Sequence, residues 1–72
     1  MKKIKKIKIK VNGKFELISD NYKMSDLVKD LKIPLKKVAI ELNQEIIDKK
    51  KLNSVDLKKK DNIEIVHFIG GG

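Results

Sequence analysis

The sequence predicts an α+β fold in which one main helix lies across one face of a mixed sheet of four or five strands. Three observations predict it. The first third of the chain has the pattern of a β-hairpin, one amphipathic helix follows, and strand patterns occupy most of the second half. Because strands and helices do not alternate along the chain, a doubly wound parallel sheet is excluded and an α+β architecture remains.

A two-residue turn divides the predicted hairpin. Residues 6–11 alternate lysine with Ile or Val, which is the period of a strand with one apolar face. Asn12-Gly13 follows and favours a type I′ turn, because both central residues of that turn need a positive φ. Phe15 and Leu17 then alternate with polar neighbours on the returning strand, and we place Phe15 in the core.

One apolar stripe predicts the helix. Its positions are spaced at i, i+3, i+4 and i+7 and are Met24, Leu27, Val28 and Leu31. The helix should end near Pro34, because a residue that precedes proline disfavours the helical conformation.

The second half of the chain predicts three strands and one long loop. Val38–Leu42 alternates in polarity, Asn43-Gln44 is a turn, and residues 45–47 form a short returning strand. Residues 48–62 have few apolar side chains and predict a loop with one short helical turn. Residues 63–69 are apolar on both faces, which is typical of a central strand.

In this order, the predicted elements favour a β-grasp. The first and last strands would run parallel in the middle of the sheet, and the helix would cover one face. We expect one domain over residues 1–69, in which residues 1–6 are a lysine-rich extension. Residues 70–72 would be a flexible glycine tail.

Composition excludes several classes of site. The chain has 72 residues, 18 of them lysine and none arginine, and a formal net charge of +8. It contains no cysteine and a single histidine, His67, so a disulfide scaffold, a thiolate zinc site and a cysteine nucleophile are excluded. A domain of this size is too small for a deep catalytic cleft. Its longest apolar run is Val38–Ile40, so we expect no membrane span, no signal peptide and a cytoplasmic protein.

The most informative segment is Gly70-Gly71-Gly72. Such a segment is costly to order and adds nothing to a core, so it is either a frayed end or a functional peptide. Three residues reach about 10 Å and have no side chains, which suits a narrow active site. The carboxylate of Gly72, with an ordinary pKa of about 3.3–3.7, would be ionised at neutral pH and able to attack the α-phosphate of ATP.

With this tail, the chain resembles the ThiS family of ubiquitin-like sulfur carriers over residues 7–72. The segments that carry the resemblance are Val11-Asn12-Gly13, the stripe Met24-Leu27-Val28-Leu31, Val38 to Asn43, Glu45 to Ile47, Asp61, and Ile63 to Gly72. Two features depart from the family: Lys59-Lys60-Asp61 replaces a common Asp-Gly-Asp, and the net charge of +8 is unusual.

The resemblance implies a carrier rather than an enzyme. A partner adenylyltransferase similar to ubiquitin-activating enzymes would adenylate Gly72, consuming ATP, and this chain would bind no cofactor itself. A cysteine desulfurase relay would supply sulfur for a Gly72 thiocarboxylate. Thiazole synthase would then take the sulfur, with Gly70, Gly71 and Gly72 entering the active sites of the partners.

The alternation of the last strand predicts a docking surface. If Ile63 and Ile65 point to the helix, then Val66 and Phe68 lie partly exposed on the opposite face, which often marks a partner surface. Lys8 on the neighbouring strand should share that face and surround the apolar patch with positive charge, together with Lys6 and Lys10. We interpret His67 as a packed or edge residue, because no base or nucleophile stands in a recognisable relation to it.

Three alternatives remain open. A carrier of the molybdopterin synthase type also ends in Gly-Gly, and a protein-conjugating modifier would form isopeptide adducts instead of a thiocarboxylate. A basic nucleic-acid-binding module would keep its function without the glycines, but the chain lacks arginine and tryptophan, and Phe15, Tyr22 and Phe68 are not interleaved with the lysine clusters. We expect the free protein to be a monomer. We also expect that it does not bind ATP by itself, since no glycine-rich phosphate loop precedes the helix.

Overall fold

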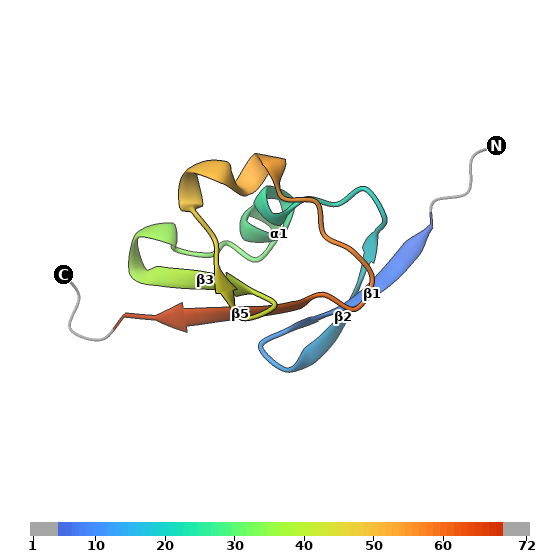
Figure 1. Cartoon of the computed structure of the whole chain (residues 1–72), viewed down its shortest axis with the longest axis horizontal. Helices are drawn as coiled ribbons and strands as arrows, with labels where there is room; N and C mark the ends of the chain where they lie inside the picture. Colours follow the sequence, from blue (N-terminus) through green and yellow to red (C-terminus); the bar gives the residue numbers. More distant parts are fainter. Residues whose placement is uncertain (1–4, 69–72) are drawn as a thin grey trace.

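The structure is a computed structural model that describes residues 5–68. They form a five-stranded sheet with helix α1 on one face (Figure 1). In chain order, the elements are β1 (Lys6–Val11), β2 (Lys14–Ser19), α1 (Met24–Asp30), the 3-10 helix η1 (Leu35–Lys37), β3 (Val38–Leu42), β4 (Glu45–Ile46), the 3-10 helix η2 (Lys49–Ser54) and β5 (Asn62–His67). The predicted α+β class and the order of the predicted elements are confirmed.

The sheet is mixed, with strand order β2-β1-β5-β3-β4. β1 and β5 run parallel, with Lys10 opposite Asn62 and Val11 opposite Ile63, while the other neighbouring pairs are antiparallel. The first and last strands therefore lie side by side within the sheet, as the β-grasp prediction required. The register also fixes which residues of β1 and β5 are neighbours, and this matters for the docking surface.

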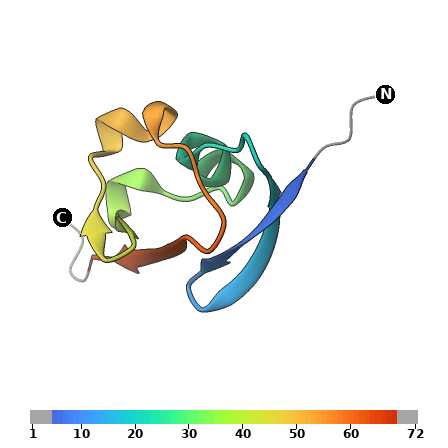
Figure 2. The same cartoon turned by 45° about the vertical axis from the view of Figure 1, so that its right-hand side comes forward.

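The core lies between the sheet and α1, and we call this side of the sheet its inner face. Its ten buried side chains are Ile9, Val11, Ile18, Met24, Leu27, Val38, Ile40, Leu52, Leu57 and Ile63. No polar or charged residue is buried in the described part of the chain. The opposite side, the outer face, carries no helix (Figure 2).

The register of the hairpin makes one prediction wrong. Asn12 and Gly13 have φ values of 49° and 83°, as a two-residue turn with positive φ requires. This turn pairs Val11 with Lys14, so Phe15 lies opposite Lys10 on the outer face and is 66% exposed. Phe15 is therefore a surface residue. The buried apolar residue of β2 is Ile18, which pairs with Ile7.

Helix α1 ends at Asp30, slightly before the predicted end, and Lys32 follows with a positive φ of 53°. At its start, the backbone N–H of Lys23 donates to the Asp26 carboxylate at 2.9 Å. The ammonium of Lys23 donates to Asp56 at 2.8 Å, joining the start of α1 to the segment after η2. That hydrogen bond holds the pKa of the Asp56 carboxyl below its usual value.

A tight turn leads into β5. Lys60 adopts a positive φ of 72°, at the position where the resembled family commonly has glycine. The Asp61 carboxylate accepts the backbone N–H of Lys58 at 2.7 Å and the side-chain amide of Asn43 at 3.0 Å. The turn therefore forms without glycine, and it fixes the start of β5 against the end of β3.

The sheet begins at Lys6, as the alternation over residues 6–11 predicts. Lys6 belongs to β1 and pairs with Ser19, and the carbonyl of Lys5 accepts the backbone N–H of Asp20 at 3.0 Å. The predicted extension over residues 1–6 thus overlaps β1 at Lys6, and Lys5 is hydrogen-bonded just before the strand. Its remaining residues, 1–4, lie outside the described part of the chain.

Candidate functional site

The end of β5 is the point from which the predicted tail starts. The backbone N–H of Phe68 donates to the carbonyl of Lys37 at 2.9 Å, so pairing with the chain before β3 continues one residue beyond the strand. Residues 69–72 follow and lie outside the described residues, so the predicted sites Gly70, Gly71 and Gly72 have no structural description here. Four residues beyond Phe68 can span at most about 13–14 Å.

Two apolar side chains near this point lie on the outer face, as the alternation of β5 predicts. Ile63 is buried on the inner face, whereas Val66 is 48% exposed and Phe68 55% exposed. Val66 is opposite Ala39 on β3, so only a methyl side chain stands beside it on that strand. The exposed pair therefore forms a small apolar surface next to the start of the tail.

A lysine covers part of that surface. The Nζ atom of Lys49 lies 5.2 Å from the centroid of the Phe68 ring, within the range of a cation–π interaction. The same ammonium donates a hydrogen bond to the carbonyl of Leu35. Lys49 therefore connects Phe68 to the segment before β3. We call Val66, Phe68 and Lys49 the tail-end patch.

The predicted neighbour of this patch, Lys8, is elsewhere. Lys10 is opposite Asn62, and the carbonyl of Lys8 accepts the backbone N–H of Lys60 at 2.9 Å. Phe68 comes eight residues after Lys60, which corresponds to about 26 Å along an extended strand. Lys8 does lie on the outer face, but the prediction that it borders Val66 and Phe68 is wrong, because β1 ends before β5 reaches them.

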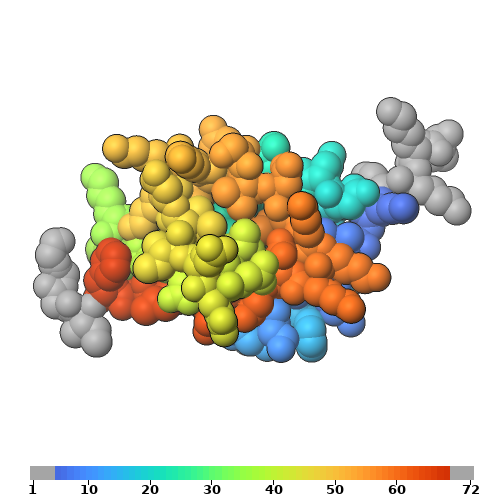
Figure 3. Space-filling view, in the orientation of Figure 1, coloured from blue at the N-terminus to red at the C-terminus, as the bar shows by residue number. Residues whose placement is uncertain are grey.

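A second exposed apolar cluster lies where β1 and β2 meet their turn. Phe15 and Leu17 are 66% and 65% exposed, and they pair with Lys10 and Lys8. The Nζ atoms of Lys8 and Lys10 lie 5.1 Å and 5.2 Å from the centroid of the Phe15 ring. We call Lys8, Lys10, Phe15 and Leu17 the hairpin-end patch. In the space-filling view, the blue hairpin and the red end of β5 occupy separate parts of the surface (Figure 3).

Side chains that could bind a metal ion are scattered over the described residues. No group of three or more His, Asp or Glu side chains that could hold a metal ion occurs within residues 5–68. His67 is exposed at the end of β5, which agrees with an edge position. No helix among these residues is long and apolar enough to cross a membrane. The geometry of the site allows it to present the segment after Phe68 to another molecule.

Comparisons with known proteins agree with this geometry. The model of the ThiS family matches residues 4–72. The chain is 40% identical over 65 residues to the sulfur carrier protein ThiS of Bacillus subtilis (strain 168), which covers 89% of this chain and 98% of that protein. The crystal structure of the thiamine biosynthesis protein ThiS from Geobacter metallireducens matches with a TM-score of 0.80 and 28% identity, over 92% of this chain and 100% of that one.

One relative is a much longer protein. The chain is 36% identical over 66 residues to a thiazole synthase of Paramagnetospirillum magneticum (strain ATCC 700264 / AMB-1). The alignment covers 92% of this chain but only 20% of the synthase. A segment similar to this small domain is therefore found within a polypeptide named for the synthase.

Proposed function

The chain belongs to the ThiS family, and from that premise we propose that it is a sulfur carrier for the thiazole branch of thiamine biosynthesis. One observation carries the proposal: the match to a sulfur carrier protein covers 98% of that protein. The family match also extends through Gly72. The chain would act as a protein cosubstrate of its partner enzymes.

The reacting group in this proposal is the α-carboxylate of Gly72. One of its oxygens attacks the α-phosphorus of ATP on a partner adenylyltransferase, and pyrophosphate leaves. A cysteine desulfurase relay supplies sulfur as a protein persulfide, whose terminal sulfur attacks the acyl carbon while AMP leaves with the bonding electron pair. A thiol then cleaves the S–S bond of the resulting acyl disulfide and is itself oxidised to a disulfide. The product is a Gly72 thiocarboxylate whose sulfur passes to thiazole synthase.

The described structure supports this use of the tail in two ways. The hydrogen bond from Phe68 to Lys37 fixes the last described residue against the sheet. The exposed side chains of Val66 and Phe68 stand beside that position and offer an apolar surface to an enzyme that receives the tail. Each partner would contact the same tail-end patch.

The thiamine pathway is preferred to the molybdopterin alternative because of the relatives. Two of them carry the name of thiazole synthase, and two others, each matched over at least 98% of its own length, carry the name ThiS. In this proposal, the adenylyltransferase and thiazole synthase act on the carrier in succession, in the cytoplasm.

The test is intact-mass spectrometry of the purified chain after incubation with ATP, a sulfur source and the adenylyltransferase of its source organism. We expect a mass change equal to the replacement of one oxygen by sulfur, mapped to Gly72. The matched control is the same chain with its Gly72 carboxylate converted to an amide. This control should keep its circular dichroism spectrum and form neither adenylate nor thiocarboxylate.

Two results would contradict the proposal. Adenylation of the amidated chain would remove Gly72 from its role. An isopeptide adduct with target lysines, in place of a thiocarboxylate, would identify a protein-conjugating modifier instead.

A further inference from the structure

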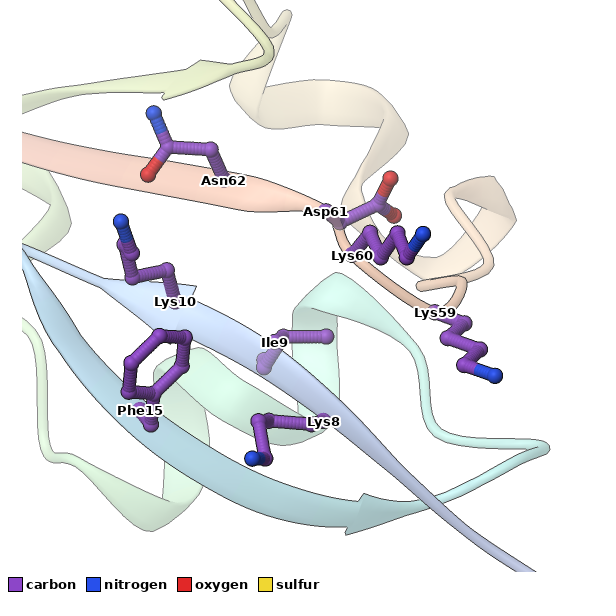
Figure 4. Close-up of a pocket in the computed structure, with 8 residues that line it drawn as sticks. All are labelled: Lys8, Ile9, Lys10, Phe15, Lys59, Lys60, Asp61 and Asn62. Carbon is purple, nitrogen blue, oxygen red and sulfur yellow. The ribbon is translucent and has the colours of Figure 1, made fainter.

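The hairpin-end patch borders an open hollow that the carrier chemistry does not use. The hollow has a volume of about 520 Å³ and lies between β1, β2 and the turn before β5 (Figure 4). The ring of Phe15 stands between the side chains of Lys8 and Lys10 (Figure 4). Lys59 and Lys60 line the hollow from the turn. An aromatic ring and four ammonium groups therefore share one surface.

The positive charge of this surface has no internal partner. Within residues 5–68, an ammonium nitrogen and a carboxylate oxygen come within 4.0 Å of each other only in the pair Lys23–Asp56. Neither of these two residues lines the hollow. Asp61 is the carboxylate that lines the hollow, but it already accepts hydrogen bonds from Lys58 and Asn43. Since Asp61 is held by these bonds, the four lysines can pair with carboxylates from outside.

The backbone at Lys60 adds to this argument. Its φ of 72° lies in the left-handed region, which costs a residue with a Cβ atom and suits glycine. The chain carries a lysine there, and its side chain lines the hollow. Strain at an exposed charged residue points to a use for that charge.

We propose that the hairpin-end patch, together with Lys59 and Lys60, binds an acidic protein segment in which carboxylates flank an apolar side chain. The carboxylates pair with the ammonium groups, and the apolar side chain packs against Phe15 and Leu17. This binding surface goes beyond the sulfur-carrier function and does not depend on the glycine tail.

Charge and stacking decide between the possible occupants. A second copy of the chain would bring its own net charge of +8 to a surface that is already positive, so like charges would repel. Bound nucleic acid uses aromatic faces for stacking, but the ammonium groups of Lys8 and Lys10 already lie over the Phe15 ring. The chain also has no arginine for bidentate phosphate contacts. An acidic protein segment satisfies the charges without displacing the lysines from the ring.

The position of the surface allows it to be occupied while the tail is in use. Lys10 and its partner Phe15 are level with Asn62, which comes four residues before Val66 and six before Phe68. These offsets correspond to about 13 and 20 Å along the strand direction. The hairpin turn itself lies beside the middle of β5, where the Asn12 side chain accepts the backbone N–H of Ile65 at 2.8 Å. A partner at the hairpin end would therefore leave the tail-end patch open to an enzyme.

The experiment is an NMR titration of the ¹⁵N-labelled full chain with a synthetic peptide of alternating Glu and Leu. A peptide with Gln at every Glu position is the control ligand. We expect amide shift changes centred on Lys8, Lys10, Phe15 and Leu17, and binding of the acidic peptide at least about tenfold tighter than that of the control. Raising the salt concentration from about 50 to about 300 mM should lower the affinity for the acidic peptide several-fold.

Matched variants separate this surface from overall charge. Lys8→Glu/Lys10→Glu and Lys50→Glu/Lys51→Glu each lower the formal net charge by four, from +8 to +4. The first pair should lose about tenfold or more in affinity, and the second should stay within about twofold. Phe15→Ser should weaken binding, whereas Ile46→Ser, which changes an apolar residue that is 74% exposed on β4, should not.

Three outcomes would overturn the proposal. The first is an equal loss of affinity in both charge-reversal pairs, and the second is shift changes centred outside the hairpin end. The third is tighter binding of a single-stranded oligonucleotide at the same residues, which would assign the surface to nucleic acid. Because all the substituted residues are exposed, each variant should keep its fold, and its amide spectrum reports this directly.

Discussion

The two ends of the outer face carry similar side chains in different settings. At the tail end, Phe68 has one ammonium near its ring and follows a strand that contains no lysine. At the hairpin end, Phe15 has two ammonium groups near its ring and lies on a strand pair rich in lysine. The tail end is the more apolar surface, and the hairpin end is the more charged one.

This difference has consequences for binding. Apolar contact area supplies affinity in a desolvated interface, whereas exposed charges mainly raise association rates and select partners. The tail-end patch is therefore suited to holding an enzyme while the tail reacts. The hairpin-end patch is suited to recognising an acidic partner, with an affinity that depends on salt.

The comparison requires Phe15 and Phe68 to lie on the surface, outside the core. The largest expected effect is therefore the loss of stability when a core residue is truncated instead. Ile63→Ala should lower the free energy of unfolding by about 2–5 kcal/mol, because Ile63 is fully buried at the centre of the sheet. Phe15→Ala and Phe68→Ala should each cost less than about 1 kcal/mol. Urea denaturation followed by circular dichroism measures all three variants.

A large loss of stability in Phe15→Ala would break the comparison. A cost as high as that of Ile63→Ala would place Phe15 in the core, as the alternation along the sequence had suggested.

The sequence was informative about β5 and misleading about β2, for a physical reason. In β5, burial follows the predicted alternation of faces: Ile63 is buried above the core and Val66 is exposed on the opposite face. In β2, both Phe15 and Ile18 are apolar but point to opposite faces, so alternation alone could not assign the inner face. The two-residue Asn-Gly turn carried the missing information, because it pairs Val11 with Lys14 and thereby sends Phe15 outward.

The location of Lys8 shows a second limit of the sequence. Its face was predicted from alternation, but its position along the neighbouring strand depends on the register between β1 and β5. Parallel strands that are distant in sequence have no turn to fix their register. In this chain the turn around Lys60 and Asp61 sets it, through the hydrogen bond from the Lys60 N–H to the carbonyl of Lys8. Lys49, which contacts Phe68, comes from a segment predicted only as a loop with a helical turn.

The second prediction compares the two ends in binding to the adenylyltransferase. Phe68→Ala should weaken binding by about tenfold or more, because an exposed aromatic side chain beside the tail is the kind of residue that dominates an interface. Phe15→Ala should have a clearly smaller effect on the same enzyme. Titration calorimetry with the purified enzyme measures both affinities.

The control for this prediction is Leu31→Ala, which removes an apolar side chain that is 47% exposed just after helix α1. Its affinity should equal that of the unchanged chain. Equal losses for Phe68→Ala and Phe15→Ala would mean that one enzyme covers both ends of the outer face, and the division into two surfaces would fail.

The smallest expected effect concerns the strain at the hairpin end. Lys60→Gly should raise the free energy of unfolding by about 0.5 kcal/mol, because relief of the positive φ slightly exceeds the added entropy of the unfolded chain. This corresponds to a rise of about 2–4 °C in the unfolding temperature. The same variant should bind the acidic peptide about two- to threefold more weakly, since one of the four ammonium groups at the hollow is lost.

The matched control for Lys60→Gly is Lys59→Gly, which removes the same charge at a residue without a positive φ. Lys59→Gly should lower the unfolding temperature, because glycine there adds chain entropy and relieves nothing. Opposite signs for the two variants would separate backbone strain from charge repulsion among the lysines. If both substitutions stabilised the chain equally, repulsion would be the cause, and the strain at Lys60 would no longer support a functional role for its charge.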